Sequence, residues 1–281
     1  MKANAIFFDE SLSYNDGLQI QESILEARIK DLIPDTVLFL EHLPVITCGV
    51  RSKPEQILLS PEELKARQIE VSKSSRGGAV TFHGPGQLIM YPIIKLGTQQ
   101  LKTVAGLDEA GPGSFRFAGP ATQDKPSPTT NLTFSHLKLG GNKTDVHGYL
   151  YNLEEVAIRT AASFGVTAYR RKGMTGAWTD EGKLAAIGVR FKRWVTFHGM
   201  SFNVAPDLSG FSAIIPCGLA GEKVTSLKIL LGNACPSLEK ARDIMINQFS
   251  VVFGRKLSML NYKCFSGDQL PFLLATLENI A

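Results

Sequence analysis

Long hydrophobic runs, closely spaced cysteines and a large excess of one charge are all missing from this 281-residue sequence. No uninterrupted apolar stretch approaches the roughly 20 residues that span a membrane, which argues against a membrane protein. The formal net charge of +4 is far from the dense basic stripe of a nucleic-acid binder. With 44% hydrophobic and 20% charged residues, the composition is that of an ordinary globular protein with a sizeable core.

The cysteines, Cys48, Cys217, Cys235 and Cys264, are scattered along the chain without a C-x-x-C pair. Their spacing argues against a zinc site and against a thioredoxin-like redox pair. A chain of this size needs no disulfides, so a reducing compartment is the simpler interpretation. The amino-terminal residues match neither a secretory signal nor an Arg-rich transit peptide. We therefore expect a protein that stays where it is made, unless a leader precedes this chain.

Helix and strand patterns follow one another without a regular βαβ order. Apolar periodicity predicts helices over 13–33, 148–164, 237–253 and 268–279, and Ser60-Pro61-Glu62-Glu63 has the capping-box pattern of a further helix start. Strands are predicted over 36–41, 45–48, 79–82, 88–96, 184–191 and 194–204. This mixture predicts an α+β fold in which helices cover a mixed or antiparallel sheet.

Residues 98–137 are rich in Gly, Pro, Ser and Thr and show no periodicity. That composition is typical of a flexible surface insertion. A linker between two domains is the alternative interpretation. We expect a single domain over 1–281 that carries this insertion.

The densest candidate motif is the segment 76–87, which is rich in glycine. Bare glycine backbone lets a ligand approach closely and offers it N–H groups. Arg76 and His83 add a fixed charge and a titratable ring on either side. The alternative is a pair of tight turns between strands, and the spacing matches neither a phosphate-binding P-loop nor a dinucleotide-binding loop.

Three further residues are candidates on local grounds. Lys183 is the last polar residue before an apolar strand, so its ammonium could reach a pocket, although a solvated strand-edge lysine is the plainer interpretation. His198 shares the apolar face of the strand 194–204, where a histidine is more often a hydrogen-bonded core residue. Cys217 stands between a proline and a glycine at the apex of a predicted turn, although a free cysteine is usually a small buried hydrophobe.

Three segments, RGGAVTFHGPGQLIMYP, TGAWTDEGKLAAIGVRFKRWVTFHGMSFNV and PDLSGFSAIIPCGL, together resemble the octanoyl-[acyl-carrier-protein]:protein N-octanoyltransferases. The resemblance runs from about Ile20 to Leu227 and leaves out the insertion. It implies the α+β fold of biotin and lipoate ligases, with Cys217 as the acyl-thioester nucleophile and Lys183 as the group that favours its thiolate. The implied substrate site consists of Arg76, Gly77, Gly78, Ala79, Val80, Thr81, Phe82, His83, Ala186, Ile187, Gly188, His198, Gly199 and Met200.

By that resemblance the donor is octanoyl-acyl carrier protein. The acceptors are lysines of lipoyl domains in 2-oxoacid dehydrogenase complexes and of the glycine cleavage H protein. A thioester is already activated, so we expect no cofactor, no ATP and no metal. Backbone N–H groups around Gly77-Gly78 or near Cys217 are the expected oxyanion donors. The long insertion favours a eukaryotic enzyme of the mitochondrial matrix, whereas a bacterial chain would be cytoplasmic.

Other functions fit parts of the pattern. An ATP-dependent lipoate or biotin ligase would share the fold and need a lysine like Lys183, but it would need no thiol at Cys217, and the G-R-G-R-x-G loop of biotin ligases is missing. A papain-like hydrolase would pair Cys217 with His83 or His198, yet the catalytic-cysteine signature of that class is absent. A non-enzymatic module that docks carrier domains would need no thiol at all.

Overall fold

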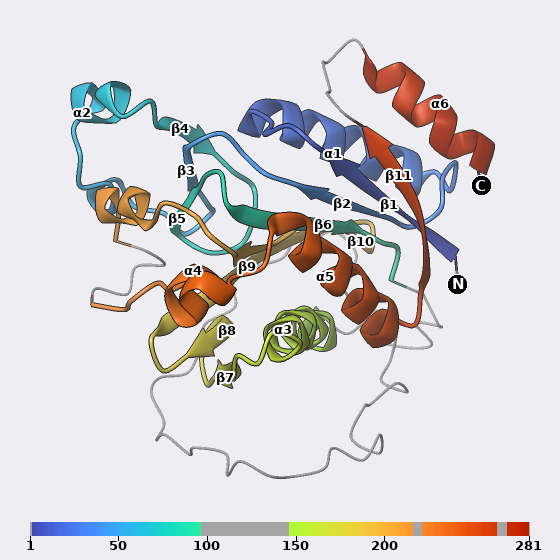
Figure 1. Ribbon diagram of the computed structural model, residues 1–281. Helices are drawn as coiled ribbons and strands as arrows, with labels where there is room; N and C mark the ends of the chain where they lie inside the picture. Colours follow the sequence, from blue (N-terminus) through green and yellow to red (C-terminus); the bar gives the residue numbers. More distant parts are fainter. Residues whose placement is uncertain (1, 97–145, 216–220, 263–268, 281) are drawn as a thin grey trace, which may run out of the picture.

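The computed structural model describes residues 2–96, 146–215, 221–262 and 269–280. Its centre is an eight-stranded sheet with the strand order β11-β1-β2-β6-β10-β9-β8-β7 (Figure 1). The strands are β1 (Lys2–Phe8), β2 (Thr36–Leu40), β6 (Gln87–Ile93), β7 (Tyr169–Arg171), β8 (Met174–Thr179), β9 (Gly182–Lys192), β10 (Val195–Asn203) and β11 (Lys256–Tyr262). Strand β1 runs parallel to β2 and β11, whereas all other neighbours in this sheet are antiparallel.

A second sheet, of the order β4-β3-β5, lies at one end of the large one. It is formed by β3 (Val45–Cys48), β4 (Glu70–Lys73) and β5 (Val80–His83). The helices are α1 (Tyr14–Ile29), α2 (Pro61–Ala66), α3 (Val146–Ala162), α4 (Leu227–Leu231), α5 (Leu238–Phe253) and α6 (Leu270–Ile280), with 3₁₀ turns at Pro54–Gln56, Leu208–Ala213 and Gly232–Ala234.

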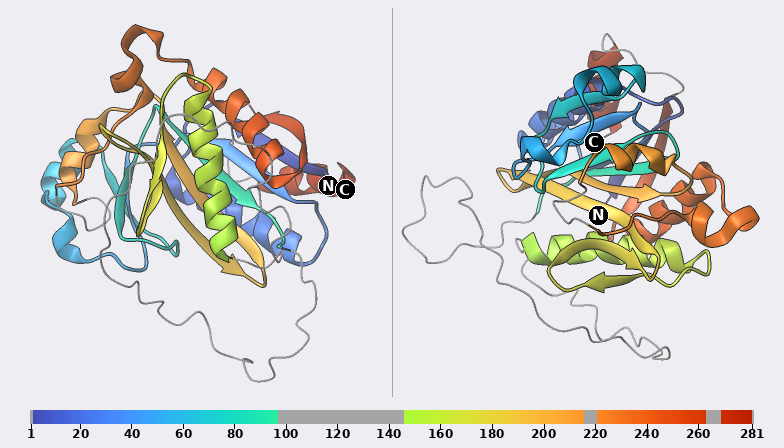
Figure 2. Two further views of the ribbon diagram at one scale, coloured as in Figure 1. Left: turned by 90° about the horizontal axis from the view of Figure 1, so that it is seen from below. Right: turned by 90° about the vertical axis from the view of Figure 1, so that its left-hand side faces the viewer.

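Side chains that alternate along the strands build a core on each face of the large sheet. In β1, Ala5 and Phe7 point to the face covered by α3 and α5, whereas Ile6 and Phe8 point to the face covered by α1 and α6. The left view of Figure 2, which is seen from below, shows α3 lying across the strands. This mixed sheet with helices on both faces confirms the predicted α+β fold class.

Several predicted elements agree with the structure, and the two helix ends described next show where the prediction holds and where it does not. The Ser60 hydroxyl accepts a hydrogen bond from the Glu63 N–H while the Glu63 carboxylate accepts one from the Ser60 N–H, so the capping box is confirmed. The helix predicted over 13–33 is too long, because α1 ends at Ile29 and Asp31 turns to a left-handed φ of 59°. Leu32, which follows the end of α1, is 49% exposed.

The sequence reasoning missed β1, β4, β7, β8 and β11. The predicted insertion at 98–137 lies outside the described residues. Within the part of the chain that the structure covers, no helix has the length and apolarity needed to cross a bilayer.

Candidate active site

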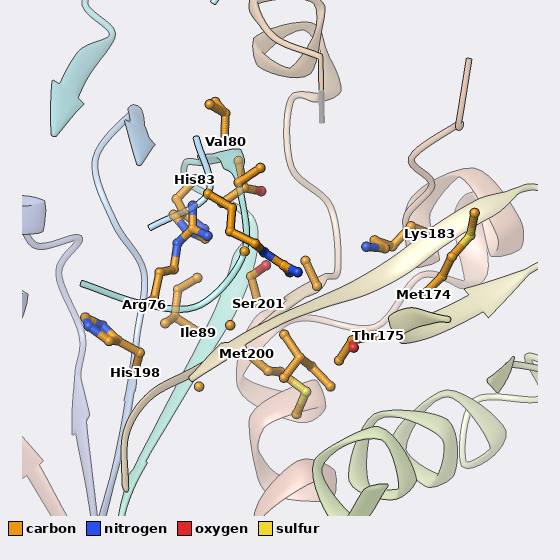
Figure 3. A pocket seen from close by; sticks show the side chains of 18 of the residues that line it. Arg76, Val80, His83, Ile89, Met174, Thr175, Lys183, His198, Met200 and Ser201 are labelled. Atoms are coloured by element: carbon orange, nitrogen blue, oxygen red, sulfur yellow. The ribbon is translucent and has the colours of Figure 1, made fainter. Parts of the chain in front are cut away.

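A cavity of about 380 Å³ lies where the segment 76–83 meets strands β9 and β10. This volume is within the range of roughly 300–1,000 Å³ that is typical of small-molecule sites. Figure 3 shows Arg76 and His83 on one side of the cavity, with Lys183 and Met174 on the other. Its lining consists of Tyr14, Arg51, Gln56, Arg76, Gly78, Ala79, Val80, Thr81, His83, Ile89, Tyr91, Gly173, Met174, Thr175, Lys183, Ala186, Ile187, Gly188, His198, Gly199, Met200 and Ser201.

Arg76 is buried and holds the glycine-rich segment against β3. Its guanidinium donates to the Thr47 carbonyl at 2.6 Å and to the Thr47 hydroxyl at 2.8 Å. A further N–H of the same group donates to the carbonyl of Gly77 at 3.1 Å. These bonds fix the charge of Arg76 at the cavity wall.

Glycines let the backbone of the segment pack directly on β9. The Gly77 N–H donates to the Val189 carbonyl at 3.0 Å. A Cβ on Gly188 would lie 2.8 Å from the Gly77 carbonyl oxygen, and Gly78 has a φ of 95° that favours glycine. Because its N–H is already used, Gly77 is not available as the oxyanion donor that the sequence suggested.

Three buried histidines, His42, His83 and His198, lie at or beside the cavity. Burial lowers the pKa of His42 to about 4. Burial, reinforced by His42 and Arg76, lowers the pKa of His83 to about 3. Burial and then Arg76 lower the pKa of His198 to about 3. All three rings are therefore neutral at pH 7, and they offer the cavity hydrogen-bonding groups without adding charge.

His198 occupies an unusual place in β10. Its backbone has a φ of 55°, and its N–H donates to the Gln21 side-chain oxygen at 2.9 Å. Its Nε2 lies 3.0 Å from the Ser75 hydroxyl. A left-handed histidine inside a strand is a strained conformation, and such conformations cluster at functional sites.

Lys183 stands at the start of β9 and is 8% exposed. Its Nζ lies 4.7 Å from the ring centroid of Trp178, which fits a cation–π contact. Its backbone pairs with a segment that is distant in sequence, since the Lys183 N–H donates to the Lys223 carbonyl at 2.8 Å and the Thr225 N–H donates to the Lys183 carbonyl at 3.0 Å. The lysine is therefore a buried group of the cavity wall rather than a solvated strand edge.

Cys217 lies outside the described residues, but the chain on either side of it is held at the cavity. Before it, the Ile215 N–H donates to the carbonyl of Gln56, a cavity residue, at 2.8 Å. After it, Lys223 and Thr225 form backbone hydrogen bonds with Lys183. Both ends of the stretch that carries Cys217 thus start from walls of the same cavity.

The other cysteines have weaker positions. Cys264 lies outside the described residues. Cys48 and Cys235 are half-buried, and neither contributes to the cavity lining. Burial raises the pKa of the Cys235 thiol, which disfavours the nucleophilic thiolate. Over the described ranges, no cluster of three or more His, Cys, Asp or Glu side chains could hold a metal ion.

The structure gathers most of the predicted substrate-site residues at the cavity. Phe82 and Gly77 are not part of the lining, because Phe82 packs in the small-sheet core and Gly77 ties the segment to β9. The roles of the other residues stay predictions. The sequence reasoning missed Tyr14, Arg51, Gln56, Ile89, Tyr91, Gly173, Met174, Thr175 and Ser201. Tyr14 lies within the predicted helix 13–33 and Tyr91 within the predicted strand 88–96, but no local pattern marked them as cavity residues.

Comparisons with known proteins agree with this geometry. The family described as "Lipoyl protein ligase A/B catalytic domain" matches residues 13–110 and 129–250. The residues between these two matches fall inside the predicted insertion. Two similar curated relatives are octanoyltransferases, one from Acidobacterium capsulatum with 37% identity over 93% of this chain and 94% of the relative. The other, from Chloroflexus aurantiacus, is 36% identical over 90% of this chain and 95% of its own length.

Solved structures show the same fold at low sequence identity. Lipoate-protein ligase A bound with ATP has a TM-score of 0.66 at 12% identity and covers 99% of this chain and 95% of its own. A bipartite lipoate protein ligase from Thermoplasma acidophilum has a TM-score of 0.65 at 12% identity, over 99% of this chain and 92% of its own. The curated relatives named above are bacterial, so the mitochondrial compartment stays a prediction.

Proposed function

The chain belongs to the lipoyl protein ligase A/B catalytic-domain family, and we propose that it transfers an octanoyl group from acyl carrier protein to a lysine of a lipoyl domain through a thioester on Cys217. The geometry that supports this proposal is the anchoring of the described residues that flank Cys217 in sequence, with Ile215 held at Gln56 and Thr225 held at Lys183. Two residues of chain span at most about 7 Å, and Ile215 itself is held by Gln56, which lines the cavity.

In the first half-reaction, the Cys217 thiolate attacks the octanoyl carbonyl of the donor. A new carbon–sulfur bond forms as the bond to the phosphopantetheine sulfur breaks, and the Lys183 ammonium gives its proton to the departing thiolate. Exchange of one thioester for another is nearly isoenergetic, so the step needs no ATP and no cofactor.

In the second half-reaction, the acceptor lysine attacks the acyl-enzyme. Lys183, now neutral, takes the proton that the attacking amine loses, and the Cys217 sulfur leaves as the thiolate. The ammonium and the thiolate are thereby restored. Because an amide is more stable than a thioester, this step drives the transfer forward.

The cavity is suited to an aliphatic chain. Val80, Ile89, Ile187 and Met200 offer apolar side chains among the lining residues. Burial of each methylene contributes about 0.8 kcal/mol, which favours a medium chain over an acetyl group. The proposed acceptors are the lipoyl domains of 2-oxoacid dehydrogenase complexes and the glycine cleavage H protein.

Intact-mass spectrometry tests the proposal. Incubation with octanoyl-acyl carrier protein alone, without ATP, is expected to add one octanoyl mass that hydroxylamine removes. Cys217→Ala is expected to abolish the adduct and the transfer, whereas the matched control Cys235→Ala keeps both. An adduct that persists in Cys217→Ala, or transfer that requires ATP and lipoic acid, would contradict the proposal.

A further inference from the structure

Glu154, on α3, lies beside β8, the neighbour of the strand β9 that carries Lys183. One of its carboxylate oxygens accepts a hydrogen bond from the backbone N–H of Gly176 in β8 at 3.0 Å. The other forms an ion pair with Nε of Arg170 at 3.1 Å, and the Glu154 side chain is 13% exposed. A carboxylate this buried that binds a strand backbone holds that strand in place.

Gly176 lies next to the side chain of Lys183. It has a φ of 131°, and a Cβ built on it would lie 2.4 Å from the Ala185 carbonyl oxygen and 3.4 Å from Cε of Lys183. The glycine precedes Ala177, and the β8–β9 register shifts just after Ala177, between the pairs Ala177–Ala185 and Trp178–Lys183. The N–H that Glu154 holds therefore belongs to a residue that lies next to the stem of Lys183.

Charge connects the two side chains as well. Burial raises the pKa of the Glu154 carboxyl, while the Gly176 N–H, Arg170 and Lys183 oppose that rise. The Glu154 carboxylate and the Lys183 ammonium are therefore close enough to attract each other. In water-poor surroundings this effect is larger than between exposed charges.

Several other charged side chains on α3 and β7, near Glu154 and Lys183, also form ion pairs. Glu155 on α3 pairs with Arg159 and with Arg170 on β7. Arg171 on β7 pairs with Glu222 at 2.7 Å and lies over the Trp178 ring that also contacts Lys183. Loss of the Glu154 charge would leave Lys183 among cations with one compensating carboxylate fewer.

We propose that Glu154 is a positioning residue of the transfer reaction, which holds Lys183 at the cavity wall through Gly176 and supports its positive charge. This inference rests on the proposed function, because it assigns Glu154 the task of keeping Lys183 ready to protonate the departing sulfur. Glu154 acts through Lys183 and does not itself touch the substrate.

The test measures acyl-enzyme formation from octanoyl-acyl carrier protein across a pH series, by quenching and intact-mass spectrometry. Glu154→Gln keeps an oxygen for the Gly176 N–H and removes only the charge. In the pH–rate profile of acyl-enzyme formation, the fall in rate on the alkaline side is called the alkaline limb. For Glu154→Gln this limb is expected to move to lower pH by about half a unit or more, with a rate at pH 8 lowered about three- to tenfold. The matched control is Glu155→Gln, which also removes a carboxylate from Arg170 and is expected to leave the limb unchanged.

Glu154→Asp separates charge from packing. It keeps the carboxylate, so its alkaline limb is expected to stay near that of the wild type even where its rate falls. The proposal is overturned if Glu154→Gln has the wild-type profile, if Glu155→Gln shifts equally, or if the Asp and Gln variants shift alike. If wild-type protein forms no acyl-enzyme at all, the proposed function itself fails, and the two failures are thereby distinguished.

Discussion

The ammonium nitrogen of Lys183 lies 4.7 Å from the ring centroid of Trp178, and the ring covers a lysine that is itself 8% exposed. Such a contact helps to keep the cation in the cavity wall. A lysine in this position can both give and take a proton, which an arginine cannot do at any ordinary pH. Its two roles in the proposed reaction are therefore separable by substitution.

Lys183→Arg is expected to affect the two half-reactions unequally. The guanidinium cannot protonate the departing thiolate, but its positive charge still stabilises that thiolate, so acyl-enzyme forms from octanoyl-acyl carrier protein at a reduced rate. It cannot accept the proton of the attacking amine, so amide formation falls by about 10²-fold or more. Lys183→Met removes the charge too and is expected to depress both steps. Rapid-quench mass spectrometry of each half-reaction provides the measurement, and equal losses in Lys183→Arg would contradict the assigned roles.

Gly188→Ala is expected to impair transfer by displacing the glycine-rich segment. The new Cβ would lie 2.8 Å from the Gly77 carbonyl oxygen and 3.2 Å from Cδ of Arg76, so the segment must move. A shift approaching 1 Å at a catalytic wall lowers rates by about 10²-fold, and overpacking costs about 1–3 kcal/mol of stability. Steady-state kinetics and urea unfolding measure the two effects.

Gly84→Ala is the control for that substitution. Its Cβ would meet the Phe82 ring at 3.1 Å, and Gly84 does not line the cavity. A side-chain ring can yield where a backbone carbonyl cannot, so we expect transfer close to that of the wild type. Equal losses in both variants would show that general packing, and not the position of the segment, sets the rate.

Local patterns predicted much of the fold, because they depend on residues that are neighbours in sequence. The capping box at Ser60 and the hairpin of β9 and β10 follow from short segments, and both are present. By contrast, β1 pairs in parallel with β11 in a register that joins Lys2 to Lys256. No periodicity within either segment carries information about a partner so far along the chain.

The residues of the candidate site likewise divide into those that local sequence patterns indicate and those that only the tertiary packing brings to the site. The segment 76–83 was found because its glycines and polar residues stand together in the sequence. Gln56 and Glu154 were missed, since each reaches the site only through the packing of its own element. Glu154 lies one position from the buried Leu153 in a helix that was predicted over 148–164, but an acidic residue beside an apolar face is usually solvated.

Acid is expected to destabilise the protein through its buried histidines. The pKa of His42 is lowered to about 4, and the pKa values of His83 and His198 to about 3. An unfolded chain has histidine pKa values of about 6.5, so below that pH the unfolded state binds more protons than the folded state. The free energy of unfolding therefore falls as the pH drops from about 6.5 toward 4, by up to about 1.4 kcal/mol per pH unit for each ring.

His42→Gln isolates one of these rings, because His42 does not line the cavity. The variant loses the hydrogen bonds of the ring to the Leu12 carbonyl and the Tyr91 hydroxyl, so it is less stable at pH 7. Its stability should nevertheless depend on pH less steeply, by about one proton between pH 6.5 and 4.5. Urea unfolding across that range gives the slope, and a slope identical to the wild type would show that His42 is not neutral in the folded state.

Asp35 is expected to be a strong determinant of stability, since its 5% exposed carboxylate binds several groups at once. It pairs with Arg28 at 2.8 Å and with Arg255, just before β11, at 2.8 Å, and it accepts the Lys95 N–H. Asp35→Asn leaves two guanidinium groups without their buried countercharge, which costs about 3–5 kcal/mol. Asp31→Asn, the control, removes a 61% exposed partner of the same Arg28 and should cost less than about 1 kcal/mol. Equal losses in urea unfolding would mean that the Asp35 carboxylate is solvated and that its ion pair with Arg255 does not hold the chain just before β11.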